Sequence, residues 1–576
     1  YLMRTTRFIG STYAEYEIAN GLIFRTTWSM DNSFVEEDQY SNTRLATGEA
    51  NNGSASSTIT RDNNWINENV LTYQTRFGTD HDLNVLFGNT LQENRFTRTS
   101  ASGTQFANDL FKNIASAAVK NSSSVGSSWG ISSYFTRINY GFQGKYLLTL
   151  NMRADASSRF GVDNRWGYFP SVAAAWRISD EAFMQDLSAI SDMKFRVSYG
   201  VTGNQAGIGD FQSRGLWGGQ RGGLNLGGQG QPGGPAAYVD DAGITANQLA
   251  NPNLKWETTN QINLGLDLGL FDDKLTVSLD VYNKQTKDLL LAVPVPRTTG
   301  YSSLVQNFGE IENKGFELGI NGTIIQKSDF NWNASFNISQ NKNLVKKIAS
   351  PFTTFTRDYI RVEEGAPLYS FWVHVQNGVD PETGDAIWES GDDATFNPNV
   401  HRYLYGDANP RFVGGLTNTL NYKNFDMMLF FQFSEGNEVL NYGRFFFEHG
   451  GTRTTGYTSQ QLDRWQQPGD VTDVPRMTTA NYASNLRPSR HVEDGSYLRL
   501  KNLMVGYAIP TDVTSRLGIG MSRARVYLQA QNLITWTNYT GLDPEVSTSP
   551  GNLVAGVDIA VMPQPRTFTG GITLTF

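Results

Sequence analysis

The sequence predicts an all-β fold made of long antiparallel strands, and three observations support this prediction. Apolar and polar residues alternate over segments of about ten residues or more, whereas strands of soluble sheets average roughly five or six. The polar side of these segments carries Asn, Ser, Thr and Gly rather than Lys and Glu. Short turns alternate with long polar connections. Together these features are typical of a transmembrane antiparallel β-barrel, which faces lipid with its apolar side and closes because the bilayer core cannot hydrogen-bond a free sheet edge.

Composition excludes several other classes of protein. The chain has 576 residues, of which 18% are charged and 12% aromatic, and its longest apolar runs fall far short of the ~18 residues that a membrane-spanning helix needs. No cysteine is present, which excludes disulfide scaffolds and thiolate metal sites. The net charge of −8 argues against a nucleic-acid partner. The five histidines are scattered along the sequence, and no motif indicates a metal or a cofactor.

Residues 262–283 show the strand pattern most clearly. Two alternating segments, 262–271 and 274–283, flank Asp272-Asp273, which fits a two-residue hairpin loop. With this loop the aliphatic face contains the pairs Leu270–Leu275, Leu268–Val277, Leu266–Leu279 and Leu264–Val281. The other face is small and polar and pairs Asp267 with Ser278. A slip of one residue would destroy both faces, so the register is well specified.

The same pattern predicts the other elements in order. The first strand is expected at about Thr12–Ala19, and the last runs to Phe576. Short turns are expected near Asn20-Gly21, Thr79–Asp82, Gly144-Lys145, Asp272-Asp273, Lys327-Ser328 and Lys423-Asn424. Long connections are expected at 37–64, 98–128, 203–257, 342–410, 436–495 and 536–564. Outer-membrane barrels have this asymmetry, with short periplasmic turns and longer external loops.

The number of strands bears on the organisation of domains. The pattern gives about 17 strands, whereas bacterial single-chain barrels have an even number. Counting back from a C-terminus on the periplasmic side, the first strand would begin outside the cell. We therefore expect residues 1–576 to be the C-terminal portion of an outer-membrane β-barrel, with the first strands and any plug not in this sequence.

Six segments of the chain, spread over nearly its whole length, resemble one known family. They are SSRFGVDNRWGYFPSVAAAWRIS (157–179), NPNLKWETT (251–259), NFGEIENKGFEL (307–318), DGSYLRLKNLMVGYAIP (494–510), QNLITWTNYTGLDPE (531–545) and PRTFTGGITLTF (565–576). These segments resemble the barrel of SusC/RagA-type TonB-dependent transporters of Bacteroidetes. The resemblance implies a 22-stranded barrel, an N-terminal plug and a TonB box. Nothing in this sequence resembles the plug or the TonB box, so coupling to TonB is assigned to no residue here.

The resemblance also implies partners. A SusD-like surface lipoprotein would form a lid over the barrel, and the TonB complex would act through the plug. Outer-membrane lipid would surround the strands, and a homodimer of the SusC–SusD pair is left open.

Tryptophans in or beside loops are the candidate substrate-binding residues. Trp129, Trp217, Trp372 and Trp388 could each stack on a sugar ring or pack against a peptide side chain. Packing within the loops is the competing interpretation for each of them.

The end of the chain resembles a barrel-insertion signal. Phe568, Ile572 and Leu574 alternate with small polar residues, and Phe576 is the last residue. Closing the barrel as its final strand explains the same pattern equally well.

Four other features favour no catalytic or metal site. Gly126–Gly130 fits a serine-nucleophile motif around Ser128, but a strand-like segment follows it instead of the helix that this motif requires. The Gly-rich run 215–234 has two interpretations. It fits a mobile external loop that gates entry, and it equally fits an insertion without structural constraint. The acidic segments 380–385 and 389–393 lack calcium-loop spacing and are expected to be solvated turns.

Two functions are consistent with these features, and neither is enzymatic. The first is active, TonB-dependent import of an oligomeric nutrient, a glycan or a peptide, through the barrel. The second is a structural or adhesive outer-membrane barrel that binds partners through its external loops without transport.

Overall fold

The computed structural model describes most of the chain. The described residues are 1–218, 237–238, 241–301, 303–354, 359–393, 395–448, 456–478, 486–516, 520–545, 547 and 554–576. They divide into two compact units. Unit 1 contains residues 1–176, 198–260 and 286–308, and unit 2 contains residues 177–197, 261–285 and 309–576.

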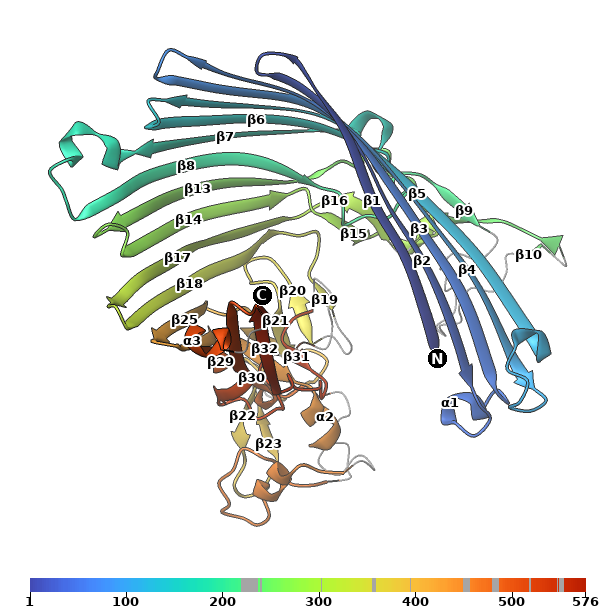
Figure 1. The fold of residues 1–576 in the computed structure, drawn as a ribbon. Helices are drawn as coiled ribbons and strands as arrows, with labels where there is room; N and C mark the ends of the chain where they lie inside the picture. The colour runs from blue at the N-terminus through green and yellow to red at the C-terminus, as the bar shows by residue number, and fades with distance from the viewer. Residues whose placement is uncertain are drawn as a thin grey trace. The chain divides into compact units, whose positions relative to one another are not determined.

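Within the described residues, seventeen strands belong to one sheet, which agrees with the predicted number (Figure 1). They are β1 (Leu2–Ala19), β2 (Leu22–Ser41), β3 (Ser54–Phe77), β4 (His81–Phe106), β5 (Ala117–Phe142), β6 (Tyr146–Ser157), β7 (Trp166–Arg177), β8 (Ile190–Asn204), β13 (Glu257–Leu270), β14 (Leu275–Lys287), β17 (Glu310–Gln326), β18 (Phe330–Lys347), β25 (Phe412–Tyr422), β26 (Phe425–Glu435), β29 (Tyr497–Ile509), β30 (Arg523–Thr537) and β32 (Thr567–Thr575).

All six predicted short turns join consecutive strands of this sheet. Gly21, with a φ of +75°, closes the β1–β2 turn, and an added Cβ there would lie 2.2 Å from the carbonyl oxygen of Gln74. At the β13–β14 turn, Phe271, Asp272 and Asp273 all have positive φ. Asx residues tolerate this conformation better than most, which explains why Asp272-Asp273 forms a tight turn.

The strands of unit 1 have one apolar face. Antiparallel pairing places Phe24 opposite Leu71, Leu71 opposite Phe87, and Tyr140 opposite both Leu83 and Leu148. Near the turns, Tyr146 stacks on Trp176 with their ring centroids 6.4 Å apart. Further along the same face, Tyr134 stacks on Trp166 at 6.2 Å.

These two aromatic pairs mark the edges of a lipid-facing band. Trp166 and Trp176 are the ends of a ten-residue step along β7, which corresponds to about 33 Å of extended chain. A strand tilted by about 40° would cross about 25 Å over that length, which is the height of the apolar band of outer-membrane barrels. The aromatic residues therefore occupy the positions expected for interfacial girdles.

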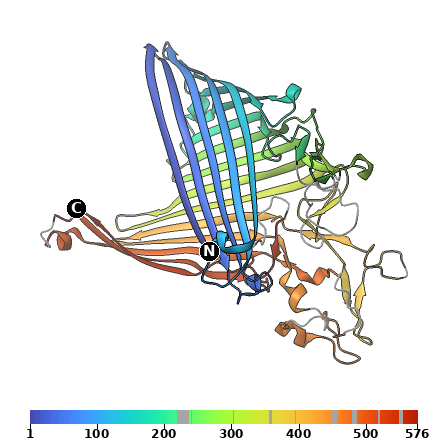
Figure 2. The ribbon, with the colours of Figure 1, turned by 90° about the vertical axis from the view of Figure 1, so that its right-hand side faces the viewer.

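Strands β2 to β5 continue well beyond this band. β4 and β5 pair from His81 opposite Phe142 to Phe106 opposite Ala117, and β2 pairs with β3 out to Ser41 opposite Ser54. Figure 2 shows these blue strands running side by side along their full length. The predicted long connections 37–64 and 98–128 are therefore wrong for most of their residues, since only 42–53 and 107–116 lie between strands. β1 likewise begins at Leu2 rather than at Thr12.

The strands of unit 2 form a second antiparallel series with the same division of faces. Phe336 lies opposite Leu416, Leu416 opposite Phe431, and Phe431 opposite Leu500. On the other face, Ser335 donates to Asn321 at 2.6 Å. The predicted pair Asp267–Ser278 is also in contact, with a hydrogen bond of 3.0 Å.

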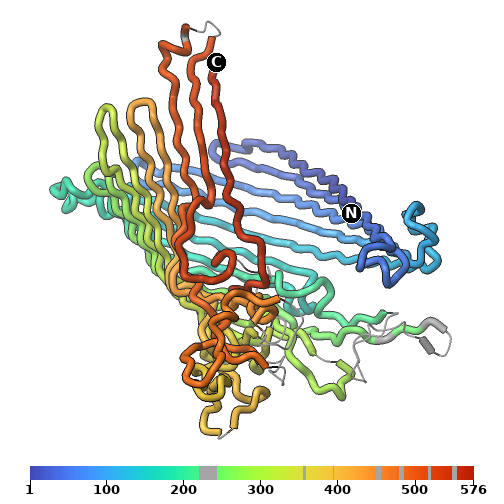
Figure 3. Tube along the Cα trace, turned by 90° about the horizontal axis from the view of Figure 1, so that it is seen from below, coloured from blue at the N-terminus to red at the C-terminus, as the bar shows by residue number. Residues whose placement is uncertain are grey.

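Three long connections of unit 2 carry most of its short elements. They span 348–411, 436–496 and 538–566, close to the predicted boundaries. Figure 3 shows these connections gathered at the end of the strands opposite the turns. Their elements are β19 (Phe352–Thr354), β20 (Ile360–Val362), β21 (Ser370–Val373), β22 (Gln376–Val379), β23 (Ala386–Trp388), β24 (Tyr403–Asp407), β27 (Glu438–Asn441), α2 (Gly443–Phe447), η7 (Ser459–Asp463), η8 (Ser489–His491), β28 (Val492–Asp494) and β31 (Val557–Asp558).

The remaining elements are short. They are α1 (Ala46–Glu49), η1 (Ile114–Ser116), η2 (Val162–Asn164), η3 (Ile178–Asp180), η4 (Ala182–Met184), β9 (Leu216–Gly218), β10 (Ala237–Tyr238), β11 (Asp241–Ala242), β12 (Thr245–Gln248), β15 (Leu290–Pro294), η5 (Arg297–Thr299), β16 (Ser303–Asn307) and α3 (Thr511–Ser515). Among the described residues, no helix has the length and apolar character needed to cross a membrane.

Candidate functional site

The polar face of unit 2 is lined by hydrogen-bonding side chains. Thr323 donates to Asn333 at 2.9 Å, and Gln529 donates to Asn502 at 3.0 Å. Tyr282 donates to Asn341 at 3.0 Å. Amides and hydroxyls of this kind favour a wet surface, because each keeps donors or acceptors available to water or to a polar ligand.

Charged residues on this face are neutralised in pairs. Arg196 lies between Asp267 and Asp280 and donates to both carboxylates at 2.9–3.0 Å, and Lys194 lies 3.0 Å from Asp267. In the same way, Arg525 donates to Asp426 at 2.8 Å. Bidentate pairs of this geometry fix the guanidinium and cross-link neighbouring strands of the wall.

The three long connections of unit 2 fold together around one apolar core, and we call them the connection assembly (348–411, 436–496 and 538–566). Each connection contributes buried residues, which are Tyr359, Ile360, Phe371 and Val373 from the first, Leu440, Tyr442 and Phe445 from the second, and Val557 from the third. β27 and β31 pair in parallel, with Leu440 opposite Val557. The assembly is therefore a folded body rather than a set of independent loops.

His374 fastens the first connection to the second. Its imidazole is fully buried, its Nε2–H donates to the carbonyl of Pro398 at 2.9 Å, and its Nδ1 accepts the backbone N–H of Arg487 at 2.8 Å. Burial, helped by the positive charges of Arg402 and Arg487, lowers the pKa of His374 to about 4. The ring is therefore neutral at pH 7, as both hydrogen bonds require.

This depressed pKa predicts a loss of stability in acid. An exposed imidazole takes up a proton near pH 6.5, whereas His374 in the folded assembly resists protonation until about pH 4. The unfolded assembly therefore binds more protons between these values, and stability falls as pH falls through this window. We expect proteolysis within 348–411 and 436–496 to accelerate several-fold between pH 7 and pH 4.5. In the control His374→Gln, which keeps a donor and an acceptor without titrating, an equally steep acceleration would contradict this assignment.

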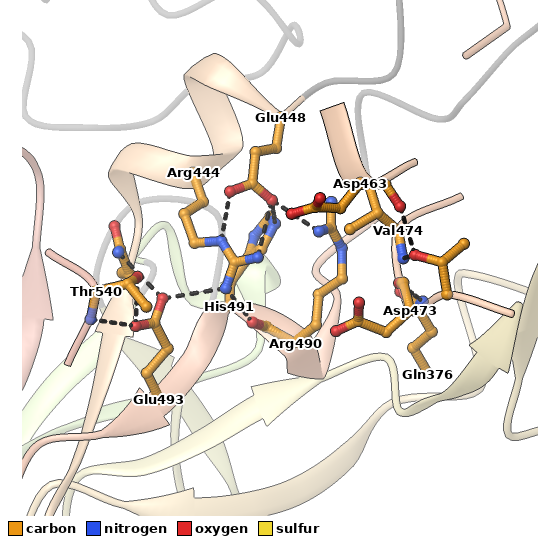
Figure 4. Close-up of polar contacts among 12 residues, drawn as sticks. Gln376, Arg444, Glu448, Asp463, Asp473, Val474, Arg490, His491, Glu493 and Thr540 are labelled. Atoms are coloured by element: carbon orange, nitrogen blue, oxygen red, sulfur yellow. Dashed lines mark hydrogen bonds and ion pairs between the residues drawn. The ribbon is translucent and has the colours of Figure 1, made fainter. Parts of the chain in front are cut away.

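A buried ion-pair network connects the second connection to the third (Figure 4). Glu448, whose side chain is fully buried, accepts from Arg444 at 2.6 and 3.0 Å and from Arg490 at 2.7 Å. Arg444 also donates to Glu493 at 3.0 Å, and Glu493 accepts the N–H and hydroxyl of Thr540. Each buried charge therefore has a partner of the opposite sign.

His491 lies beside this network and stays neutral. Burial, followed by the charges of Arg490 and Arg444, lowers the pKa of His491 well below its ordinary value. Its Nε2 lies 3.9 Å from the nearer oxygen of Glu448, which is too long for a hydrogen bond. The two arginines therefore carry the positive charge that balances Glu448.

Arg499 anchors the third connection to strand β29. This side chain is 2% exposed and lies 2.5 Å from Asp543 and 2.7 Å from Glu545. Its Nε donates to the hydroxyl of Thr535 at 2.9 Å. The segment around Asp543 is therefore attached to the wall through a fully paired guanidinium.

The four predicted tryptophans occupy different environments. Trp129 in β5 lies 5.0 Å beneath the guanidinium of Arg159, which pairs with Asp210. Trp372 in β21 contacts Arg361 at 4.0 Å and Arg402 at 5.5 Å. Trp388 stacks on Phe396 at 5.5 Å and meets His374 edge-on.

Only one of the four has a largely open ring. Trp217 in β9 is 68% exposed, whereas the rings of the other three are engaged by neighbouring side chains. Trp129 and Trp217 belong to unit 1, while Trp372 and Trp388 belong to the first connection of unit 2. Most of the Gly-rich run 215–234 lies outside the described residues.

The C-terminal residues lie on the lipid-facing side of β32. Phe568 is opposite Ala530, Ile572 opposite Val526 and Leu574 opposite Ala524. Phe568, Ile572 and Phe576 are 70–72% exposed. The alternation read from the sequence therefore corresponds to one outward apolar row.

The other tempting motifs have structural roles. Ser128 lies inside β5, so no strand–turn–helix surrounds it. Asp380 accepts hydrogen bonds from the backbone N–H groups of Glu382 and Thr383, as expected of a turn. Glu389 accepts hydrogen bonds from the side-chain amide of Asn377 and the backbone N–H of Gly391. Across the described ranges, no group of three metal-ligating side chains is close enough to hold an ion.

Sequence reasoning missed the buried ion pairs. Arg444 and Glu448 are four residues apart, a spacing that could have indicated a pair. The contacts from Arg499 to Asp543 and from Glu493 to Thr540 leave no such local signal, because they join residues 44 and 47 positions apart.

Comparison with known proteins gives consistent matches. A family model described as TonB dependent receptor-like, beta-barrel matches residues 4–533. TonB-dependent receptor P3 of Formosa agariphila is 34% identical, over 98% of this chain and 57% of the relative. TonB-dependent receptor SusC of Bacteroides thetaiotaomicron is 32% identical, over 77% of this chain and 43% of the relative.

Solved structures give the same result. The structure of the RagAB peptide transporter matches with a TM-score of 0.85 and 26% identity, over 100% of this chain and 62% of that chain. The RagAB peptide importer in its 'open-open' state matches with a TM-score of 0.86. This chain thus spans less than two thirds of the length of these relatives.

Proposed function

The chain belongs to the TonB-dependent receptor-like β-barrel family, whose members lie in the outer membrane, and from this premise we propose that the complete protein imports oligomeric nutrients in a TonB-dependent manner. The observation that carries the proposal is the pairing of two features. One is a wall whose polar face is hydrogen-bonding and internally charge-neutralised. The other is a packed connection assembly that gives one end of the strands a defined surface. A wet passage and a shaped entrance suit an oligomeric glycan or peptide.

The proposal includes partners for the complete protein. A SusD-like lipoprotein would cover the connection assembly, and the TonB complex would act through a plug. RagAB is described as a peptide transporter and SusC as a TonB-dependent receptor, and both resemblances support this arrangement. A homodimer of the SusC–SusD type remains part of the proposal.

Residues 1–576 are proposed to form the C-terminal portion of the barrel, with the C-terminus on the periplasmic side. The greater length of the relatives supports this proposal. Phe568, Ile572, Leu574 and Phe576 are proposed to form the insertion signal, because their outward row is accessible to an insertion machinery and to lipid.

Uptake by cells tests the proposed function directly. We expect deletion of the gene to abolish growth on at least one oligomeric glycan or peptide, and the intact gene to restore it. Purification in mild detergent should yield a lipoprotein together with the barrel. Unchanged growth on every oligomer tried, together with an adhesive or matrix partner, would instead support the structural barrel.

Trp217 is the tryptophan proposed to contact cargo, because its ring is the most exposed of the four. Aromatic stacking contributes about 0.5–1.5 kcal/mol, so Trp217→Ala should weaken cargo binding by about threefold to tenfold. The matched control is Ile244→Ala, which removes an apolar side chain of similar exposure, 71%, from the same connection. If the two substitutions changed the Kd of the imported oligomer equally, Trp217 would not be a specific cargo contact.

A further inference from the structure

A cavity of about 650 Å³ opens on the polar face of unit 1. Arg137 and Asn151 lie opposite each other on β5 and β6, and the adjacent lipid-facing pair is Ile138 with Leu150. Because successive side chains of a strand point to opposite faces, Arg137 and Asn151 face away from lipid. Strands β3 to β8 all contribute to the lining.

The floor of this cavity is made of two phenylalanine rings lying on glycines. An added Cβ at Gly88 would lie 2.3 Å from the ring of Phe135. Added Cβ atoms at Gly167 and Gly203 would lie 2.4 and 2.2 Å from the ring of Phe169. Each ring therefore rests against the backbone of a neighbouring strand, and on its other side the guanidinium of Arg153 lies 5.3 Å from the centroid of the Phe135 ring. Phe169 is buried and meets Trp256 edge-on.

Two arginines line the cavity, and they differ in their partners. Arg153 is paired, since it donates to Asp155 at 2.9 Å and to Ser133 at 2.8 Å. Arg137 donates through Nε to Asn151 at 2.9 Å and, within the described part of the chain, meets no carboxylate. Its exposed guanidinium thus keeps its Nη groups available for an anion, beside an aromatic floor.

The rest of the lining is mixed, with hydroxyl groups, apolar side chains and a second carboxylate, Glu68, besides the Asp155 that pairs with Arg153. Val70, Leu86 and Val201 line the cavity, as does Glu68, which accepts only a long hydrogen bond of 3.4 Å from Thr90 among the described residues. An oligosaccharide would bring hydroxyl groups against these apolar side chains, and the hydroxyl groups would have no hydrogen-bond partner there. An oligopeptide would bring apolar side chains, N–H donors for Glu68 and a terminal carboxylate.

We propose that this cavity is a cargo subsite that binds the C-terminal carboxylate of an oligopeptide at Arg137, with the last side chain of the peptide against Leu86, which lies opposite Arg137 in the sheet, and Val70. The proposal rests on the import function proposed above and specifies its cargo. Every linear peptide ends in one carboxylate next to one side chain, so such a subsite recognises peptides without reading their sequence. A guanidinium is suited to this role because it binds a carboxylate through two parallel hydrogen bonds.

The test uses the complete transporter purified in detergent and one defined pentapeptide ending in leucine, as the free acid and as the C-terminal amide. We expect the free acid to bind about tenfold or more tightly than the amide, because the charge-assisted bond is lost in the amide. Arg137→Gln should weaken binding of the acid to about the level of the amide, and it should weaken binding of the amide much less, because the amide carries no charge. Arg137→Lys, which keeps the charge, should restore part of the difference.

Three results would overturn the subsite. The wild type could bind acid and amide equally, Arg137→Gln could weaken both equally, or an oligouronide could be bound while the peptide is not. In the last case cellular uptake of the oligouronide would leave the import function standing. If the unmodified protein took up no oligomer at all, the proposed import function itself would be wrong.

Discussion

Replacing Glu448 by alanine is expected to destabilise the connection assembly by about 3–5 kcal/mol, the cost of removing one partner of a buried ion pair. The substitution removes the carboxylate that Arg444 and Arg490 share in a buried site, where 9–12% of each arginine side chain is exposed, and it leaves Glu493 as a partner of Arg444. Neither arginine can lose its proton, so the buried positive charge that Glu448 balanced must be solvated by opening the structure. Hydrogen exchange and limited proteolysis within 436–496 should both accelerate by about a hundredfold or more.

The matched control is the exposed pair Arg476–Asp385. Its nitrogen and oxygen lie 2.8 Å apart, but both side chains are about half exposed. Asp385→Ala should therefore cost less than about 1 kcal/mol. If Glu448→Ala and Asp385→Ala had the same small effect, the buried network would not hold the connections together, and the polar contacts of Figure 4 would be incidental to the assembly.

Leu528→Arg is expected to impair insertion of the barrel into the outer membrane, whereas Gln529→Arg should be tolerated. Leu528 lies opposite Val505 and Gly570 on the apolar face and is 69% exposed. Arginine on the lipid face costs about 2–4 kcal/mol near the bilayer midplane and less near its surface. Gln529 is the next residue of the same strand and faces the hydrogen-bonding side, where it donates to Asn502.

The measurement is the fraction of protein recovered as folded, detergent-resistant barrel from outer membranes. We expect a drop of severalfold for Leu528→Arg and little change for Gln529→Arg. Both variants add the same charge at adjacent positions of one strand. A difference in recovery between them therefore depends on which face of the strand carries the arginine. Loss with Gln529→Arg and normal recovery with Leu528→Arg would mean that the faces are assigned the wrong way round.

The strand predictions succeeded where lipid imposes a pattern. Around Asp272-Asp273 the alternation of Leu and small polar residues gave the turn and the Asp267–Ser278 contact, because a bilayer-facing strand must keep one face apolar throughout. Beyond the aromatic girdle this constraint ends. There, residues 54–64 and 117–128 are rich in Ser and Thr on both faces, yet they remain strands through backbone pairing and contacts such as Thr58–Ser100 at 3.0 Å.

The candidate binding residues illustrate a different limit. Tryptophans in or beside the predicted loops were identified from the sequence as candidates, but their exposure depends on which side chains pack over them. Trp388 lies against Phe396 and Trp372 against two arginines, whereas Trp217 stays open. A sequence reveals the type of side chain and its approximate place, and the neighbours that cover a ring come from other segments.

The sequence by itself determined the barrel class, the turns, the two faces of the strands that cross the lipid-facing band and the family resemblance, because all of these depend on residues close together along the chain. Only the tertiary structure decided that three distant connections share one core, that Glu448 joins Arg444 and Arg490, and that His374 hydrogen-bonds to a residue 113 positions away. Such contacts leave no periodic pattern in the sequence. They form when strand pairing brings the connections to one end of the wall, where burial of their apolar and charged groups selects the partners.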